Sequence, residues 1–168
     1  MRLSIQDRRH IEASEGWLGL GNWTEANHEL DHVTAALRDH PDVLRLRFEV
    51  CTAAKNFELA TEIASALCKQ RPGDPEPCLL LGRALHGKQT TEVAVNFLTE
   101  AAKEFPNDHR IPLDLARYHC ALNDVVRAAA WLKRAIEISD TKEVKLAALD
   151  DPLLLPLWDQ IGQVPLAR

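Results

Sequence analysis

The chain has 168 residues, of which 46% are hydrophobic, and a formal net charge of −5. This mild negative charge argues against a general affinity for nucleic acid or for anionic membrane. No apolar run approaches the roughly 18 residues of a membrane span, and the first residues lack the apolar stretch of a secretory signal. Four scattered cysteines without a CxxC pair fit a reducing compartment. We therefore expect a cytoplasmic protein that binds neither nucleic acid nor membrane.

The predicted elements are all helices. Helical spacing of apolar residues, capping residue types and helix-ending prolines define them, and no sustained strand alternation appears. The expected ranges, in chain order, are 7–20, 23–39, 42–54, 57–70, 75–87, 91–104, 109–122 and 125–138, followed by a ninth helix over 142–149.

The helices repeat with a period of 34 residues. Four alanines mark the period: Ala26, Ala60, Ala94 and Ala128. A residue type that caps helix N-termini precedes each of them: Asn22, Asn56, Thr90 and Asp124. Apolar residues also recur four and seven positions after each alanine, which places them on one helix face. A fixed period of this length indicates an array of stacked units, and such arrays usually bind other molecules along an extended surface.

The repeat resembles the tetratricopeptide repeat (TPR), a helix–turn–helix unit of 34 residues. The third unit carries the resemblance best, through Leu81-Gly82, Leu85, Ala94, Leu98, Ala101 and Pro106. The second unit departs from it, because Arg47-Phe48 stands where Leu-Gly is usual. The resemblance covers about residues 7–140. It implies an all-α, right-handed superhelical solenoid in a single domain over residues 1–168, with repeats at 7–40, 41–74, 75–108 and 109–141.

A C-terminal cap over residues 142–168 is expected to follow, because an array needs its last apolar face covered. We predict that Leu146, Leu149, Leu154, Leu157 and Trp158 provide this cover. The alternative makes residues 153–158 an exposed segment that binds a partner.

In proteins that this chain resembles, the first helix of each pair lines a concave groove. The resemblance therefore implies a partner-binding surface formed by Arg45, Leu79, Arg83, His86, Arg110, Leu113 and Arg117. Arg83, Arg110 and Arg117 would grip a carboxylate or an acidic segment. The alternative is that Glu49 pairs with Arg83 across one repeat in an exposed ion pair that contributes little.

The sequence and its resemblance together favour a non-catalytic protein-interaction module in a bacterium-like cytoplasm. It would be an adaptor or scaffold that binds a peptide or helix of a partner protein, possibly acidic. A self-associating homo-oligomer without a separate ligand is the alternative. A hydrolase or metal-dependent enzyme is a third possibility, and no catalytic signature supports it. His28 and His32 stand four residues apart, a spacing that can place two imidazoles on one metal, but no third ligand is evident. We therefore expect neither a metal nor a cofactor.

Overall fold

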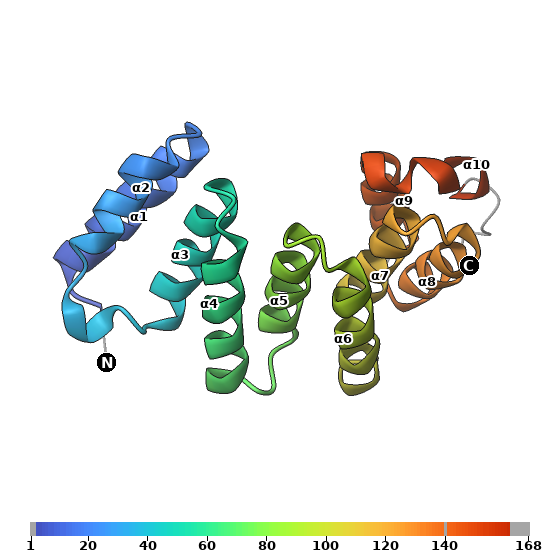
Figure 1. The fold of residues 1–168 in the computed structure, drawn as a ribbon, viewed down its shortest axis with the longest axis horizontal. Helices are drawn as coiled ribbons and strands as arrows, with labels where there is room; N and C mark the ends of the chain where they lie inside the picture. The colour runs from blue at the N-terminus through green and yellow to red at the C-terminus, as the bar shows by residue number, and fades with distance from the viewer. Residues whose placement is uncertain (1–2, 140, 162–168) are drawn as a thin grey trace. The chain divides into compact units, whose positions relative to one another are not determined.

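The computed structural model describes residues 3–139 and 141–161, and this part of the chain is helical throughout, with no strand (Figure 1). Its α-helices are α1 (Ile5–Gly19), α2 (Trp23–Asp31), α3 (Pro41–Ala53), α4 (Phe57–Gln70), α5 (Pro75–Gly87), α6 (Thr91–Glu104), α7 (Arg110–Ala121), α8 (Val125–Ile138), α9 (Thr141–Leu149) and α10 (Trp158–Ile161). Two 3₁₀ helices, η1 (Ala35–Leu37) and η2 (Pro152–Leu157), complete the set.

The chain forms two compact units, one over residues 1–88 and one over residues 89–168. In the first unit α1 packs against α2, α3 against α4, and α4 against α5, while the first helices α1, α3 and α5 contact one another in order. In the second unit α6 contacts α7, α7 packs against α8, and η2 lies against both α7 and α8. Sequence neighbours are thus spatial neighbours within each unit, as the repeat predicts.

The four alanines that mark the repeat lie in the packed interior of the helices. Ala26, Ala60, Ala94 and Ala128 are all fully buried, with 0% of their surface exposed. The predicted caps also form in three of the four repeats, because Asn22, Asn56 and Asp124 each accept a backbone N–H from the third residue after them. Thr90 makes no such capping hydrogen bond. The all-α repeat fold predicted from the sequence is therefore confirmed.

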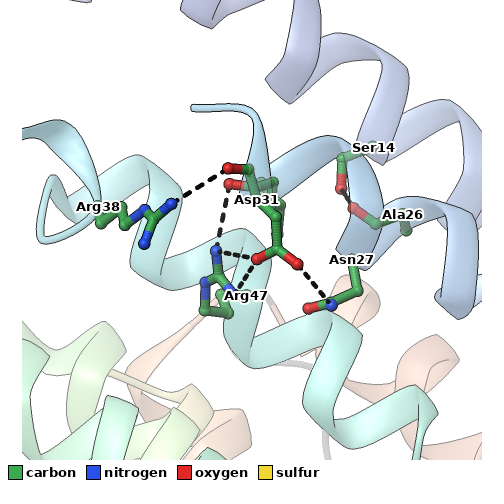
Figure 2. A network of polar contacts seen from close by, with 7 residues as sticks. Ser14, Ala26, Asn27, Asp31, Arg38 and Arg47 are labelled. Carbon is green, nitrogen blue, oxygen red and sulfur yellow. Dashed lines mark hydrogen bonds and ion pairs between the residues drawn. The ribbon is translucent and has the colours of Figure 1, made fainter. Parts of the chain in front are cut away.

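Helix α2 is shorter than the sequence predicts, because it ends at Asp31 rather than near residue 39. Figure 2 shows the contacts at this end. Arg47 of α3 donates to the carbonyl of Leu30 and to Asp31 Oδ1, both at 3.2 Å. Arg38 Nη2 donates to the carbonyl of Asp31 at 3.3 Å. Basic side chains stabilise the unpaired carbonyls at a helix C-terminus, so Arg47, which departs from the repeat, closes α2 early.

A buried carboxylate holds the segment that follows α2. Asp7, in the first turn of α1, is 3% exposed and accepts the backbone N–H of Thr34 at 2.9 Å. It also accepts the hydroxyl and the backbone N–H of Ser4. These hydrogen bonds, chiefly that from the Ser4 hydroxyl, hold the pKa of Asp7 well below its usual range. The carboxylate therefore stays ionised and ties the start of α1 to residue 34.

The predicted cap in the second unit buries a partly different set of residues from the one expected. Leu154 and Leu157 of η2 are fully buried, as predicted, in a cluster with Leu132 and other residues of α7 and α8. The prediction was wrong for Leu146 and Leu149 of α9, which are 53% and 41% exposed. The buried face of α9 carries residues 144 and 148 instead, which are four apart and so share one side of the helix. Trp158 is partly exposed and donates its indole N–H to the carbonyl of residue 148.

A buried histidine in the second unit lacks a hydrogen-bond partner for one of its ring nitrogens among the described residues. His119 of α7 is 4% exposed, and its Nδ1 makes no hydrogen bond to any residue that the structure describes. Asp124 Oδ2 lies 3.7 Å from that nitrogen, beyond hydrogen-bond distance. Burial lowers the pKa of His119, and the charge of Asp124 offsets this only in part. The folded protein therefore keeps this imidazole neutral.

This histidine should make the protein less stable in mild acid. The unfolded chain takes up a proton at His119 near the ordinary histidine pKa of about 6.5, whereas the folded chain does so only at lower pH. The unfolded state thus binds more protons below that pH, and stability falls as pH decreases. When the pH is lowered from about 7.5 to about 5.5, we expect the melting temperature of His119→Leu to fall by less than that of the wild type. Equal losses in both proteins, measured by circular dichroism, would contradict this assignment.

In the first unit, Gly87 at the end of α5 is packed against an aromatic ring. A Cβ added at Gly87 would lie 2.3 Å from the nearest ring atom of Phe57. We expect Gly87→Ala to lower the free energy of unfolding by about 1–3 kcal/mol because the ring must move. Gly16→Ala in α1 is the matched control, since nothing lies within 4 Å of its added Cβ. Urea unfolding should show the control unchanged or slightly more stable, because alanine favours a helix.

Candidate partner-binding surface

The first unit contains an open hollow of about 630 Å³ beside its first helices. We refer to it as the α1–α3 hollow, because its walls come from these two helices and from the segments that lead into them. Its lining residues are Leu3, Arg8, Ile11, Glu12, Glu15, His40, Asp42 and Arg45. A narrow recess, lined by Leu67, Glu76 and Leu80 among others, shares Asp42 and Arg45 with it. Of the residues that the sequence predicts for the partner-binding surface, Arg45 lies in its lining.

The charged groups of the α1–α3 hollow are weakly paired. Arg45 Nη2 lies 3.5 Å from Glu15 Oε1, and both side chains are about half exposed. Within the described part of the chain, Arg8 and Glu12 have no ion pair or hydrogen bond from their side chains. His40 Nδ1 accepts the backbone N–H of Asp42 at 3.3 Å, which requires this nitrogen to be unprotonated. Both signs of charge therefore remain available to a ligand beside apolar surface from Ile11.

The other predicted residues of the first unit lie on α5. Arg83 Nη2 is 2.5 Å from Glu49 Oε1, and its guanidinium lies 4.9 Å from the centroid of the buried Phe48 ring. The ion pair between Glu49 and Arg83 is thus formed, as the alternative interpretation of the sequence had it. Leu79 and His86 are both partly exposed. An acidic ligand at Arg83 would have to compete with Glu49.

The three predicted residues of the second unit are all engaged within that unit. Arg110 Nη2 pairs with Asp108 Oδ2 at 2.6 Å. Leu113 is 6% exposed and belongs to the hydrophobic cluster that η2 completes. Arg117 donates to Asp114 at 2.5 Å and, through its Nε, to Asp151 at the start of η2. Leu113 and Arg117 therefore contribute to the attachment of the cap, whereas Arg110 pairs beside its own helix.

Sequence reasoning missed Asp151, although a signal for it was present. Glu49 and Arg83 are 34 residues apart, and so are Arg117 and Asp151. Residues 15, 49, 83 and 117 lie in successive first helices at intervals of 34 positions, and the next position in this series is 151. The prediction from sequence also did not include Leu3, Glu12 and His40, which line the α1–α3 hollow. Leu3 and His40 precede a helix rather than lying in one, so the repeat columns do not include them.

The described residues offer little for catalysis. No three histidine, cysteine, aspartate or glutamate side chains among them are arranged as a metal site. Burial raises the pKa of the Cys51 and Cys120 thiols, which disfavours the nucleophilic thiolate. No helix in this part of the chain has the length and apolar character to cross a membrane.

The role of Arg117 in the cap can be tested by its removal. We expect Arg117→Ala to lower the free energy of unfolding by about 1–3 kcal/mol, because it leaves Asp114 and Asp151, both largely covered, without their cation. Lys103→Ala is the control, since its ion pair with Glu100 is 67% and 72% exposed and should contribute less than about 1 kcal/mol. Equal urea midpoints for the two variants would show that Arg117 does not secure the cap.

Comparisons with known proteins agree with this architecture. Residues 85–149 match the family model described as tetratricopeptide repeat. No curated protein matches the sequence. Among solved structures, MamA 41-end from Desulfovibrio magneticus RS-1 has a TM-score of 0.66 at 20% identity, covering 79% of this chain and 75% of that one. The MamA RS-1 ArsTM double mutant has a TM-score of 0.65 at 19% identity, covering 82% and 77%.

A third structure, MamA AMB-1, covers 96% of this chain and 100% of its own, with a TM-score of 0.58 at 17% identity. At these identities the similarity concerns the fold alone. The match of residues 85–149, the 34-residue alanine column and the paired helices described above lead to the same assignment. Over residues 85–149 the chain belongs to the tetratricopeptide-repeat family, and its described part has the all-α fold of such repeats.

Proposed function

We propose that this protein is a non-catalytic interaction module that binds a peptide or helix of a partner protein on the face formed by its first helices. In the first unit this face contains the α1–α3 hollow, which is the observation that carries the proposal. Its volume of about 630 Å³ is within the range of ligand-binding clefts. Arrays of helical repeats commonly bind an extended or helical segment in this way.

The contacts in the hollow support a ligand that combines an apolar side chain with charged groups. Ile11 offers partly exposed aliphatic surface, and Arg8 offers a guanidinium that has no carboxylate partner among the described residues. Arg45 is held only loosely by Glu15, so a ligand carboxylate can replace that contact at little cost. The acidic partner anticipated from the sequence would thus meet Arg8 and Arg45 rather than Arg83, which Glu49 already occupies.

The proposal is tested with a random peptide library selected against the protein. We expect Arg8→Glu with Arg45→Glu to lower the affinity for the selected peptides by at least about tenfold, because the substitutions reverse the charge of both cations in the hollow. The matched control is Arg9→Glu with Lys69→Glu, which makes the same change of charge at exposed positions outside the lining. Affinity is measured by fluorescence anisotropy.

Circular dichroism establishes that both double variants remain folded. Selected peptides that bind the Arg8 and Arg45 variant and the wild type equally well would place the binding surface elsewhere. If both double variants bind the peptides equally weakly, the loss of affinity is due to net charge and contradicts the proposal. A selection that enriches no peptide also contradicts it.

A further inference from the structure

The first unit contains a cluster of three histidines that the proposed function does not use. His28 lies in α2, and His32 is the residue that caps the C-terminal end of that helix. Their ring centroids are 4.8 Å apart and the rings meet edge to face, at 80°. The ring of His10, from α1, lies 5.4 Å from that of His32. The sequence predicts the first two as neighbours, and the fold adds the third.

The two histidines of α2 have the spacing and freedom that a metal chelate requires. Residues four apart lie on the same side of a helix, and two imidazoles so placed bind one ion in known metal-binding helices. With metal–nitrogen bonds of about 2.0–2.1 Å, the ring centroids of two such ligands stand about 5 Å apart. The observed 4.8 Å is close to this value. Both side chains are exposed, so their rings can rotate to bring one nitrogen each toward a shared ion.

His10 is differently placed. Its Nδ1 lies 2.8 Å from Glu29 Oε2, and both side chains are about one quarter exposed. The carboxylate can only accept, so this ring nitrogen carries the proton. This hydrogen bond ties the ring of His10 in α1 to Glu29 in α2. No three histidine, cysteine, aspartate or glutamate side chains in the described residues are arranged as a metal site. His10 is therefore a neighbour of the pair and not a ligand.

We propose that His28 and His32 bind one divalent transition-metal ion of the kind that prefers imidazole, such as Zn²⁺ or Ni²⁺. Solvent completes the coordination, because both residues are exposed. Neutral imidazole is a common ligand for these ions, whereas Mg²⁺ and Ca²⁺ require oxygen donors. The site is independent of the α1–α3 hollow, whose lining includes neither residue.

The alternative is that these histidines are merely two solvated side chains on the surface of α2. Such residues bind no ion with a defined stoichiometry, and their replacement leaves metal affinity unchanged. Because protons compete with metal for imidazole nitrogen, a real chelate also weakens as the pH falls. The difference between the two interpretations is therefore measurable without knowledge of a partner.

The test uses the whole chain, without a histidine tag, and Ni²⁺ and Zn²⁺ salts in isothermal titration calorimetry. We expect saturable binding of one ion per chain and a melting temperature that rises with metal concentration, because the ion binds the folded state. His28→Gln with His32→Gln should weaken the affinity by at least about tenfold. Two matched controls, His10→Gln and His109→Gln, should keep it within about threefold of the wild type.

Absence of saturable binding would overturn the proposal, and so would binding that survives the double substitution. A loss with His10→Gln as large as that of the double variant would overturn the assignment of two ligands. Circular dichroism of each variant without metal separates loss of the ligands from loss of the fold. Added Mg²⁺ in excess should leave the titration unchanged, and competition by Mg²⁺ would contradict imidazole coordination.

Discussion

The contact that the architecture depends on is the approach of one helix to another across an alanine. The four alanines at 34-residue spacing are completely buried. The separation of packed helices depends on the side chains at their contact, and a methyl group permits a short one. Apolar residues one and two turns further along each helix then complete the same interface. Within each compact unit, a helix therefore buries its apolar surface mainly against the helices that precede and follow it in the chain.

The helix positions could be predicted from the sequence because several independent signals agree in phase. Alanine, capping residues and apolar positions share one period, and helices α3 to α8 begin and end within two residues of their predicted bounds. The end of α2 could not be predicted in this way. Its position depends on Arg47, which is sixteen residues further along and reaches the last carbonyls of the helix. The inward face of α9 also depends on its contact with η2, which helical periodicity alone does not specify.

The candidate binding surface was less predictable than the fold, for a physical reason. Periodicity specifies which residues share a face, but the availability of a charged group depends on its nearest carboxylate or cation. Arg83 and Arg117 occupy the predicted column, yet the first is paired with Glu49 and the second with two aspartates. Arg45, in the same predicted set, has only a loose partner and lies in the wall of the α1–α3 hollow. Residues that precede a helix, such as His40, carry no periodic signal at all.

The place of Asp151 shows how the regular repeat is interrupted after α8. One period after Arg117, a further repeat would supply a side chain from the middle of another first helix. Here Asp151 caps the start of the 3₁₀ helix η2, which begins with Pro152 and contains Pro156. Prolines at these positions disfavour a regular α-helix. The Asp151 carboxylate still pairs with the Arg117 guanidinium of α7. The backbone that follows forms a 3₁₀ helix instead of another pair of α-helices. At this position the regular repeat is therefore interrupted, because Asp151 keeps the ion pair with the preceding repeat while the prolines beside it disfavour another first helix.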